Sequence, residues 1–317
     1  MKAVFLDYAT MGPGLDLQPL RALFPDIAIH DDTPDAQVAE RIRDAEFVFT
    51  NKIRLSVDLL ADARKLRYIG LTATGTDNID LATATAHGIA VCNIRGYCTQ
   101  SVVEHVFGTL LLLTHSLARF HASVKAGEWQ RSGDFCLLSH PVRELSSMTM
   151  GIVGYGELGQ GVARIARQFG MQVIVSTRPG AADVADDRVS FDAVLRRADV
   201  ISLHCPLNER TRGLFDADAF AKMKSGAILI NTARGALVDS QALVDALTSG
   251  HLGGASIDVL AKEPPLHGDP ILDYAGDNLI VTPHIAWATD EARQNAVDEL
   301  AANVAAFLRG ESRNRVV

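Results

Sequence analysis

Three glycines near the middle of the chain have the spacing of a phosphate-binding turn. Gly154, Gly156 and Gly159 form the pattern G-x-G-x-x-G between an apolar run at 151–153 and a helix-like segment at 160–169. In a strand–turn–helix unit of this kind, the first glycine permits a tight turn, the second admits a pyrophosphate, and the third lets the helix pack on the strand. Backbone amides and the helix N-terminus then face the phosphates. The pattern therefore favours a dinucleotide site over a glycine-rich turn that binds nothing.

The residues after the next apolar run bear on which dinucleotide would bind. Ser176, Thr177 and Arg178 stand where an NAD site usually has an acidic residue that accepts hydrogen bonds from the ribose hydroxyls. A guanidinium instead offers fixed donors to a 2′-phosphate. Three aspartates follow at 183, 186 and 187 and would oppose a phosphate, and Arg178 could equally be a solvated loop residue. The segment favours NADP slightly over NAD and leaves both open.

Four further segments place polar residues next to apolar runs. They are His204–Gly213 (HCPLNERTRG), Ile230–Gly235 (INTARG), Asp258–Pro265 (DVLAKEPP) and Thr282–Trp287 (TPHIAW). In this order after the glycine turn, they closely resemble the D-isomer-specific 2-hydroxyacid dehydrogenases, and the resemblance spans nearly the whole chain. Residues 96–105 (GYCTQSVVEH) are similar to the glycerate dehydrogenase/hydroxypyruvate reductase branch of that family.

The resemblance implies reversible hydride transfer between a nicotinamide and a small 2-oxo or 2-hydroxy acid, with Arg234, Glu263 and His284 as catalytic residues. Reduction of a ketone builds negative charge on its oxygen, so a proton donor is needed there. An imidazole titrates near neutral pH and suits that task. A carboxylate at Glu263 would orient the imidazolium, and Arg234 would hold the substrate carboxylate and polarise the carbonyl. Each residue alone could be a surface or structural one; the ordered set favours catalysis.

The resemblance also implies binding roles for residues outside the triad. Asp258 matches the residue that binds the nicotinamide carboxamide. The amides of Thr74 and Gly75 would meet the substrate carboxylate, and Tyr97 is either a substrate contact or a ring packed at a domain hinge. Trp287 is an implied cofactor-binding residue that stands where a smaller residue is more usual, so its bulk would narrow the nicotinamide or the substrate pocket. The other implied cofactor-binding residues are Glu157, Leu158, Cys205, Pro206, Thr211, Thr232 and Ala233, together with His284 itself.

Composition restricts the class of protein. The chain has 317 residues, of which 48% are hydrophobic and 21% charged, as in an ordinary globular protein of two domains. A formal net charge of −8 without a basic stripe argues against nucleic acid or an anionic membrane as a partner. The four cysteines are scattered, without the spacing of metal ligands or of a disulfide framework. We therefore expect a cytoplasmic protein with reduced thiols and no metal site.

Short apolar runs alternate with helix-period segments along most of the chain, as in parallel βαβ units. We expect strands near 4–7, 27–30, 47–51, 68–71 and 90–93, then one long helix at about 100–126 and a loop at 127–147. A second βαβ series follows from 150 to 282, and a helix at about 290–308 closes the chain. The predicted fold is α/β, with two Rossmann-like/flavodoxin-like parallel-sheet domains. A dinucleotide-binding domain (99–287) is inserted into a substrate (catalytic) domain (1–98 plus 288–317).

Other functions compete with this one. An NAD(P)-sensing binding protein of corepressor type would share the triad, and turnover of hydroxypyruvate or glyoxylate to D-glycerate or glycolate would separate it from an enzyme. A formate- or phosphite-type dehydrogenase is disfavoured by the segment around Tyr97. The resemblance implies a homodimer, with the helix at about 102–117 as a candidate interface. The physiological substrate and the direction of flux stay open.

Overall fold

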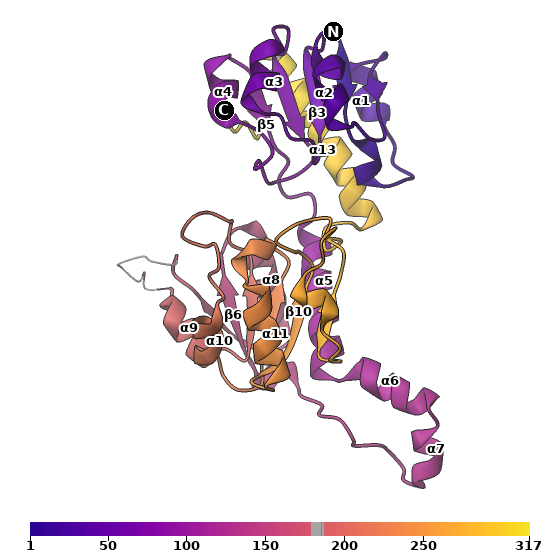
Figure 1. Ribbon diagram of the computed structural model, residues 1–317, viewed down its shortest axis with the longest axis vertical. Coiled ribbons are helices and arrows are strands. Elements are labelled where there is room, and N and C mark those ends of the chain that lie inside the picture. Colours follow the sequence, from indigo (N-terminus) through magenta and orange to yellow (C-terminus); the bar gives the residue numbers. More distant parts are fainter. Residues whose placement is uncertain (179–184, 186) are drawn as a thin grey trace. The chain divides into compact units, whose positions relative to one another are not determined.

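The computed structural model describes residues 1–178, 185 and 187–317. The chain divides into two compact units, one made of Met1–Cys98 with Ala288–Val317 and the other of Thr99–Trp287 (Figure 1). Each unit contains one parallel sheet, so the prediction of an α/β fold with two parallel sheets is confirmed. The aspartates at 183 and 186, considered above as opponents of a phosphate, lie outside the described residues.

The smaller unit has a five-stranded sheet in the order β2-β1-β3-β4-β5. Its strands are β1 (Ala3–Phe5), β2 (Ala28–Ile29), β3 (Phe47–Thr50), β4 (Tyr68–Leu71) and β5 (Ala90–Cys92). Neighbouring strands pair in parallel throughout this sheet. The order is that of flavodoxin-like domains.

The two faces of this sheet differ because alternate residues of a strand point to opposite sides. One face carries aromatic rings in contact with one another: Phe47 packs at a tilt against Phe24 and edge-to-face against Phe307. Phe24 ends α1 (Gln18–Leu23), and Phe307 belongs to the terminal helix α13 (Asp290–Leu308), so these two helices cover the aromatic face. The aliphatic face packs on α2 (Asp35–Ile42), α3 (Val57–Asp62) and α4 (Leu81–Ala86).

The larger unit has a six-stranded sheet in the order β11-β10-β9-β8-β6-β7. Its strands are β6 (Thr149–Val153), β7 (Gln172–Val175), β8 (Val200–Leu203), β9 (Ala227–Asn231), β10 (Leu252–Ile257) and β11 (Leu279–Val281). A further parallel bridge joins Ser176 to Val189 beyond the outer edge of β7. If Val189 is taken as a one-residue third strand, the order follows the 3-2-1-4-5-6 pattern of dinucleotide-binding folds, with β11 added as a seventh strand next to β10. The order of strands then reverses between β6 and β8, where such folds bind their ligand.

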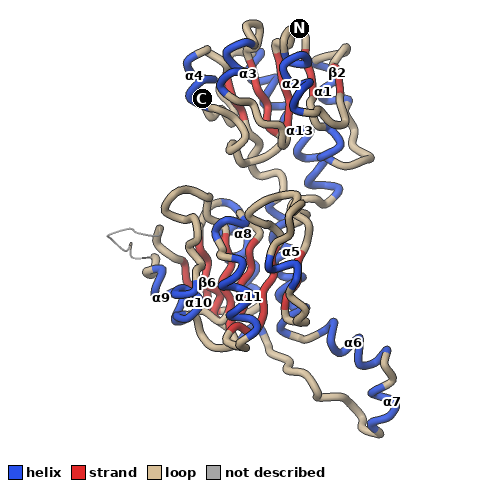
Figure 2. The backbone as a smooth tube through the Cα atoms, viewed as in Figure 1, coloured by secondary structure: helices blue, strands red, loops and turns tan. Residues whose placement is uncertain are grey.

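Helices cover both faces of the larger sheet (Figure 2). On one face, α9 (Phe191–Arg197), α10 (Ala217–Lys222) and α11 (Ser240–Thr248) pack through apolar side chains onto the strands. On the other face, α8 (Glu157–Gln168) packs against α5 (Thr99–Thr114), which also contacts β10. Most apolar residues of α5 are buried inside the unit, which explains why this helix is apolar on nearly every side.

The expected single helix at 100–126 is wrong. Helix α5 ends at Thr114, and α6 (Leu117–Lys125) starts after Ser116, whose backbone is left-handed with φ of 50°. The two helices are bent by 55°. The segment after α6 explains the break: Ser116 Oγ donates to the Pro141 carbonyl at 2.8 Å, and the Arg143 amide donates to the Thr114 carbonyl at 2.9 Å.

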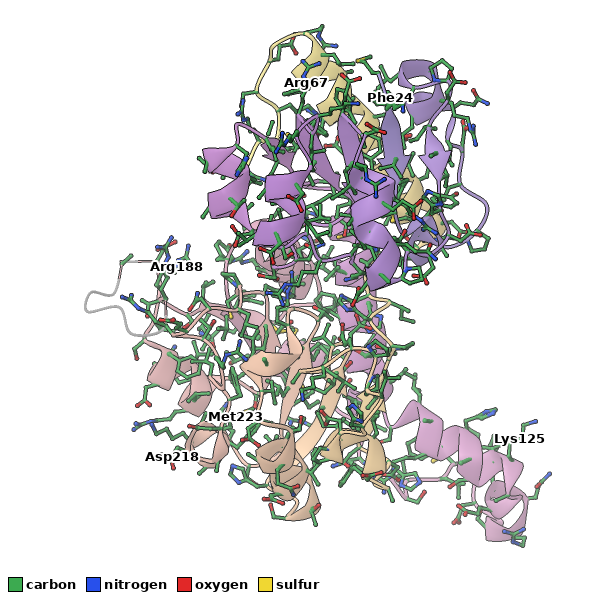
Figure 3. The ribbon with its side chains drawn as sticks, turned by 45° about the horizontal axis from the view of Figure 1, so that its top comes forward. Phe24, Arg67, Lys125, Arg188, Asp218 and Met223 are labelled. Carbon is green, nitrogen blue, oxygen red and sulfur yellow. The ribbon has the colours of Figure 1, made fainter. Side chains whose placement is uncertain are left out.

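The expected loop at 127–147 contains a further helix, α7 (Glu128–Ser132). We call residues 117–140, which include α6 and α7, the arm; it leads away from the sheet of the larger unit (Figure 1). Figure 3 shows Lys125 on this arm, well apart from Asp218 and Met223, which belong to the region of α10 in the same unit. Within the described chain, no single helix has the length and apolarity of a membrane span, although the bent pair α5 and α6 reaches that threshold together.

Candidate active site

The three glycines of the turn after β6 have three different surroundings. Gly154 has φ of +97°, and a Cβ there would lie 2.4 Å from the Cys205 amide nitrogen, at the end of β8. A Cβ on Gly159 would lie 2.1 Å from the Gly154 carbonyl oxygen. A Cβ on Gly156 would meet no atom of the described residues within 4 Å. The turn therefore combines tight packing with an open cradle at Gly156, the N-cap residue of α8, as a bound pyrophosphate requires.

Polar groups just beyond the ends of the neighbouring strands β8 and β9 also fit a polar ligand. His204 and Thr232 follow β8 and β9, and His204 Nδ1 and Thr232 Oγ1 are buried without a hydrogen-bond partner among the described residues. His204 Nε2 lies 2.8 Å from Ser202 Oγ. Burial lowers the pKa of His204 to about 4, so its ring is neutral at pH 7. A dinucleotide at this strand edge would offer partners to such groups.

The end of β7 presents the residues predicted to select the dinucleotide. Ser176 Oγ donates to the Thr177 carbonyl at 2.8 Å, and the Thr177 amide donates to the Val189 carbonyl at 2.8 Å. Arg178 is exposed. The contact to Val189 brings its neighbour Arg188 to the same edge, where the guanidinium carbon lies 4.6 Å from the centre of the Tyr155 ring in the glycine turn.

Arg188 is a residue that sequence reasoning missed (Figure 3). A basic residue before a short apolar run carries no signal of its own in the sequence, and its contact with Tyr155 arises from the pairing of Val189 with β7. Its guanidinium also pairs with Asp187 at 3.2 Å.

The other predicted cofactor-binding residues around this turn differ in their burial and in their hydrogen bonds. Glu157 Oε1 accepts a hydrogen bond from Thr99 Oγ1 at 2.5 Å, which ties the first turn of α8 to the start of α5. Cys205 is buried, which raises the pKa of its thiol to about 11, while Pro206 is exposed and Leu158 half-buried. Thr211 Oγ1 donates to the Pro206 carbonyl and accepts from the Asn208 amide, both at 2.8 Å. This hydroxyl therefore shapes the loop after β8.

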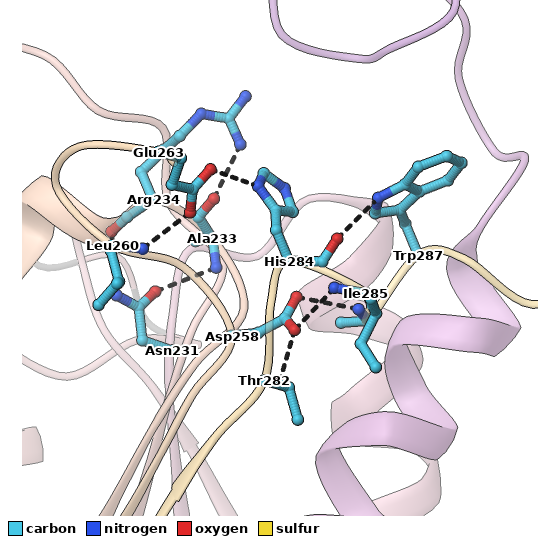
Figure 4. Close-up of polar contacts among 11 residues, drawn as sticks. Asn231, Ala233, Arg234, Asp258, Leu260, Glu263, Thr282, His284, Ile285 and Trp287 are labelled. Atoms are coloured by element: carbon cyan, nitrogen blue, oxygen red, sulfur yellow. Dashed lines mark hydrogen bonds and ion pairs between the residues drawn. The ribbon is translucent and has the colours of Figure 1, made fainter. Parts of the chain in front are cut away.

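His284 and Glu263 form a hydrogen-bonded pair beyond the ends of β10 and β11 (Figure 4). His284 Nδ1 lies 2.6 Å from Glu263 Oε2, and Glu263 Oε1 accepts from the Leu260 amide at 2.8 Å. Their side chains are 28% and 33% exposed, so the pair is accessible to a small molecule. Because Nδ1 is engaged by the carboxylate, Nε2 is the ring nitrogen that can exchange a proton with a substrate.

Arg234 follows β9 in a turn organised by Asn231. The Asn231 side chain accepts from the Ala233 amide at 3.0 Å and donates to the Arg234 carbonyl at 2.9 Å, and the guanidinium donates to the Ala233 carbonyl at 2.8 Å. A Cβ on Gly235 would lie 1.9 Å from the Leu260 carbonyl carbon. The loops after β9 and β10 therefore cross in direct contact, which brings the Arg234 turn beside the loop of Glu263 (Figure 4).

Asp258 is buried beneath the turn that carries His284. Its carboxylate accepts hydrogen bonds from Thr282 Oγ1 at 2.6 Å and from the Ile285 and Ala286 amides at 2.8 and 2.9 Å. Trp287 Nε1 donates to the His284 carbonyl at 3.0 Å. His284 itself has φ of +57°, so a strained backbone is held in place by this set of contacts.

The predicted substrate-binding residues Thr74, Gly75 and Tyr97 belong to the smaller unit. Thr74 Oγ1 donates to the Ile94 carbonyl at 3.1 Å, and Asn93 Nδ2 donates to the Thr74 carbonyl at 2.7 Å. These contacts fix the loop after β4 against the loop after β5. The Tyr97 carbonyl accepts from Asn295 Nδ2 at 3.4 Å.

Known proteins are similar to this chain in sequence and in fold. A family model described as "D-isomer specific 2-hydroxyacid dehydrogenase, NAD binding domain" matches residues 107–286. A glycerate dehydrogenase from Methylorubrum extorquens is 43% identical over 286 residues, which cover 90% of this chain and 89% of the relative. A hydroxypyruvate reductase from Blautia hydrogenotrophica is 37% identical over 323 residues, which cover 100% and 99%. The solved D-lactate dehydrogenase from Aquifex aeolicus, complexed with NAD and lactic acid, is 31% identical with a TM-score of 0.82, over 98% of this chain and 96% of that one.

Proposed function

The chain belongs to the D-isomer-specific 2-hydroxyacid dehydrogenase family and is an NAD(P)-dependent dehydrogenase acting on CH–OH groups, and we propose that its substrates are hydroxypyruvate and glyoxylate. The products would be D-glycerate and glycolate. Two similar proteins, a glycerate dehydrogenase and a hydroxypyruvate reductase, support this substrate class. The observation that carries the proposal is the 2.6 Å pair of His284 and Glu263 beside the Arg234 turn.

Each member of the proposed triad has one task. The nicotinamide, when bound, supplies the hydride in reduction and accepts it in oxidation. His284 gives a proton from Nε2 to the carbonyl oxygen in reduction and removes it in oxidation. Glu263 holds the imidazole by Nδ1 and stabilises its protonated form. Arg234 binds the substrate carboxylate with its planar guanidinium and polarises the neighbouring carbonyl.

The remaining roles concern binding. The amides of the Gly154–Gly159 turn and the start of α8 would hold the pyrophosphate. Asp258 would accept a hydrogen bond from the carboxamide, while Trp287 lies next to His284 and restricts the size of the substrate. Thr74 and Gly75 would offer backbone amides to the substrate carboxylate, and Tyr97 would contact the substrate.

We propose NADP as the better cofactor, with NAD also accepted. Arg178 is exposed at the end of β7, and Arg188 provides a second guanidinium at the same edge. A 2′-phosphate attracts such groups because each charge-assisted hydrogen bond is strong and directional.

A spectrophotometric panel tests both proposals. Each of several 2-oxo acids is offered with NADH and with NADPH, and oxidation of the cofactor is followed at fixed pH. We expect the highest kcat/KM with hydroxypyruvate or glyoxylate and NADPH. Preference for a larger 2-oxo acid would contradict the substrate, and a strong preference for NADH would contradict the cofactor.

We also propose that the protein is a homodimer that associates through the arm. Phe135 and Leu138 are 95% and 85% exposed, and Trp129 is also exposed. Large exposed apolar side chains grouped on one projection are typical of a surface that a partner covers. The helix at 102–117, considered from the sequence, is a weaker candidate because most of its apolar residues pack inside the unit.

A further inference from the structure

Helix α5 contacts both ends of the turn that carries His284. Ser101 Oγ donates to the Ala286 carbonyl at 2.7 Å, and His105 Nε2 lies 3.3 Å from Thr282 Oγ1. Residues four apart in a helix lie one above the other on the same face. Ser101 and His105 therefore form a two-point attachment between α5 and the segment 282–286.

The direction of the hydrogen bond from His105 follows from its neighbours. A hydroxyl group has one proton, and Thr282 gives that proton to Asp258, because an ionised carboxylate only accepts. Thr282 Oγ1 therefore acts as the acceptor towards His105, whose Nε2 must carry a proton. The result is one directed chain, from His105 through Thr282 to Asp258.

Asp258 connects this chain of hydrogen bonds to the backbone of the turn that carries His284. Its carboxylate accepts from the Ile285 and Ala286 amides, and its backbone carbonyl accepts from the His284 amide at 2.8 Å. The φ of +57° at His284 is unfavourable for a residue with a side chain, so the turn depends on such surroundings. A carboxylate that tilts would move the Ile285 and Ala286 amides, which directly follow His284 in the chain.

We propose that His105 is a positioning residue for His284, acting through Thr282 and Asp258, with Ser101 as the second attachment of α5. The inference rests on the proposed role of His284 as the acid. The same helix also packs closely on α8, where a Cβ at Gly161 would lie 3.0 Å from a Val103 methyl group. Helix α5 thus joins the helix of the phosphate-binding turn to the turn of the acid.

The test uses the 317-residue protein in six forms: wild type, His105→Leu, His105→Gln, Thr282→Val, the double variant His105→Leu/Thr282→Val and the control His115→Leu. We expect His105→Leu to lower kcat for reduction of a 2-oxo acid roughly three- to tenfold, the effect of one lost hydrogen bond. His105→Gln should restore most of this loss, because its amide group can donate from nearly the same position. His115→Leu is the matched control, since His115 follows α5 and its side chain makes no hydrogen bond to any described residue.

The double variant separates positioning from a general effect on the fold. If His105 acts through Thr282, His105→Leu should cost nothing further when Thr282 is already valine. Losses that multiply in the double variant, or wild-type kcat in His105→Leu, would overturn the proposal. Thermal unfolding of each variant checks that all remain folded.

A second measurement does not need turnover. The proton that His284 Nδ1 shares with Glu263 at 2.6 Å should give a far-downfield proton resonance. We expect that resonance to shift or broaden in His105→Leu and to stay unchanged in His115→Leu. An unchanged resonance in both variants would contradict the proposal, whereas a wild-type protein inactive on every 2-oxo acid would contradict the proposed function alone.

Discussion

At the scale of single residues, the proposed acid–base chemistry rests on the pair of Glu263 and His284. Both oxygens of the carboxylate are engaged, one by the Leu260 amide and one by the imidazole. The carboxylate is therefore anchored to the backbone before it meets the ring, so the imidazole keeps one orientation. This arrangement leaves Nε2 of His284 as the ring nitrogen that is open to a substrate.

Removal of the pair should change the rate and its dependence on pH. We expect His284→Ala to lower kcat by about 10²- to 10⁴-fold, the usual contribution of a general acid. Reduction should weaken as pH rises, because the acid form is lost, and oxidation should strengthen. Glu263→Gln should also lower kcat, because an amide group holds the imidazole less firmly than the carboxylate that now bonds to Nδ1.

Steady-state rates from pH 5 to 9 in both directions test this prediction. Glu128→Gln, an exposed change on the arm, is the control and should leave both profiles in place. Near wild-type turnover in His284→Ala would exclude the proposed acid.

The arginines at the end of β7 should separate the two cofactors. Arg178→Ala should raise KM for NADPH by about tenfold to a hundredfold, as expected for one charge-assisted contact, and leave KM for NADH almost unchanged. Arg188→Ala should raise KM for both cofactors, because its guanidinium supports Tyr155 in the turn that either pyrophosphate would use, and it should raise KM for NADPH more, because only NADPH carries the 2′-phosphate. Thr177→Asp should favour NADH through repulsion of the 2′-phosphate. Equal effects of Arg178→Ala on both cofactors would show that Arg178 does not contact the phosphate.

At the scale of elements, the turn between β6 and α8 offers a matched pair of substitutions. Gly159→Ala places a methyl group 2.1 Å from the Gly154 carbonyl oxygen, so it should destabilise the fold by about 1–3 kcal/mol as well as impair binding. Gly156→Ala adds a methyl group to open space, so it should leave the stability of the fold unchanged while lowering the affinity for the dinucleotide.

Thermal unfolding and a fluorescence titration with NADPH measure the two effects separately. Gly108→Ala on α5, where an added methyl group also meets no described atom within 4 Å, is the control. It should keep full affinity and gain up to ~1 kcal/mol of stability from the higher helix propensity of alanine. Undiminished affinity in Gly156→Ala would mean that the pyrophosphate binds elsewhere.

Elements were predictable from sequence where the signal is local. Apolar runs of three to five residues became strands of both sheets, and the spacing of Gly154, Gly156 and Gly159 indicated the turn. The break after α5 was not predictable, because it depends on Pro141, which is 25 residues from Ser116. The contact between His105 and Thr282 spans 177 residues and leaves no pattern in either segment. The arrangement of Arg188 over Tyr155 was missed for the same reason.

At the scale of the whole molecule, burial of an ionisable group couples stability to pH. The pKa of His204 falls to about 4 in the folded protein, whereas an unfolded histidine titrates near 6.5. Between these values the unfolded chain takes up a proton that the folded chain does not. Stability should therefore fall as pH drops from about 6.5 towards 4, by at most ~1.4 kcal/mol per pH unit from this residue.

Chemical denaturation at pH 7.0 and at pH 5.0 tests this coupling. The loss of stability between the two should be smaller in His204→Asn than in wild type. Burial also lowers the pKa of His30, so this residue should likewise lower the stability of the fold at acidic pH. His30→Asn serves as the comparison and should remove a separate part of the loss of stability between pH 7.0 and pH 5.0. An equal loss in wild type and His204→Asn would show that His204 is protonated without cost.

The exposed apolar side chains of the arm also lead to a prediction about the oligomeric state of the protein. Phe135 and Leu138 expose nearly all of their surface on the arm, and Trp129 is 48% exposed beside them. Single exposed apolar residues are ordinary, but several on one projection are expected to be covered, and a stable interface buries about 800 Å² on each partner. We therefore expect sedimentation velocity to give a dimer for the wild type, and a monomer for Phe135→Ser/Leu138→Ser with the fold retained.

Leu266→Ser is the control, because Leu266 is 81% exposed on a loop outside the arm and its loss should leave the dimer intact. A wild-type protein that sediments as a monomer at micromolar concentration would show that the arm has another partner or none.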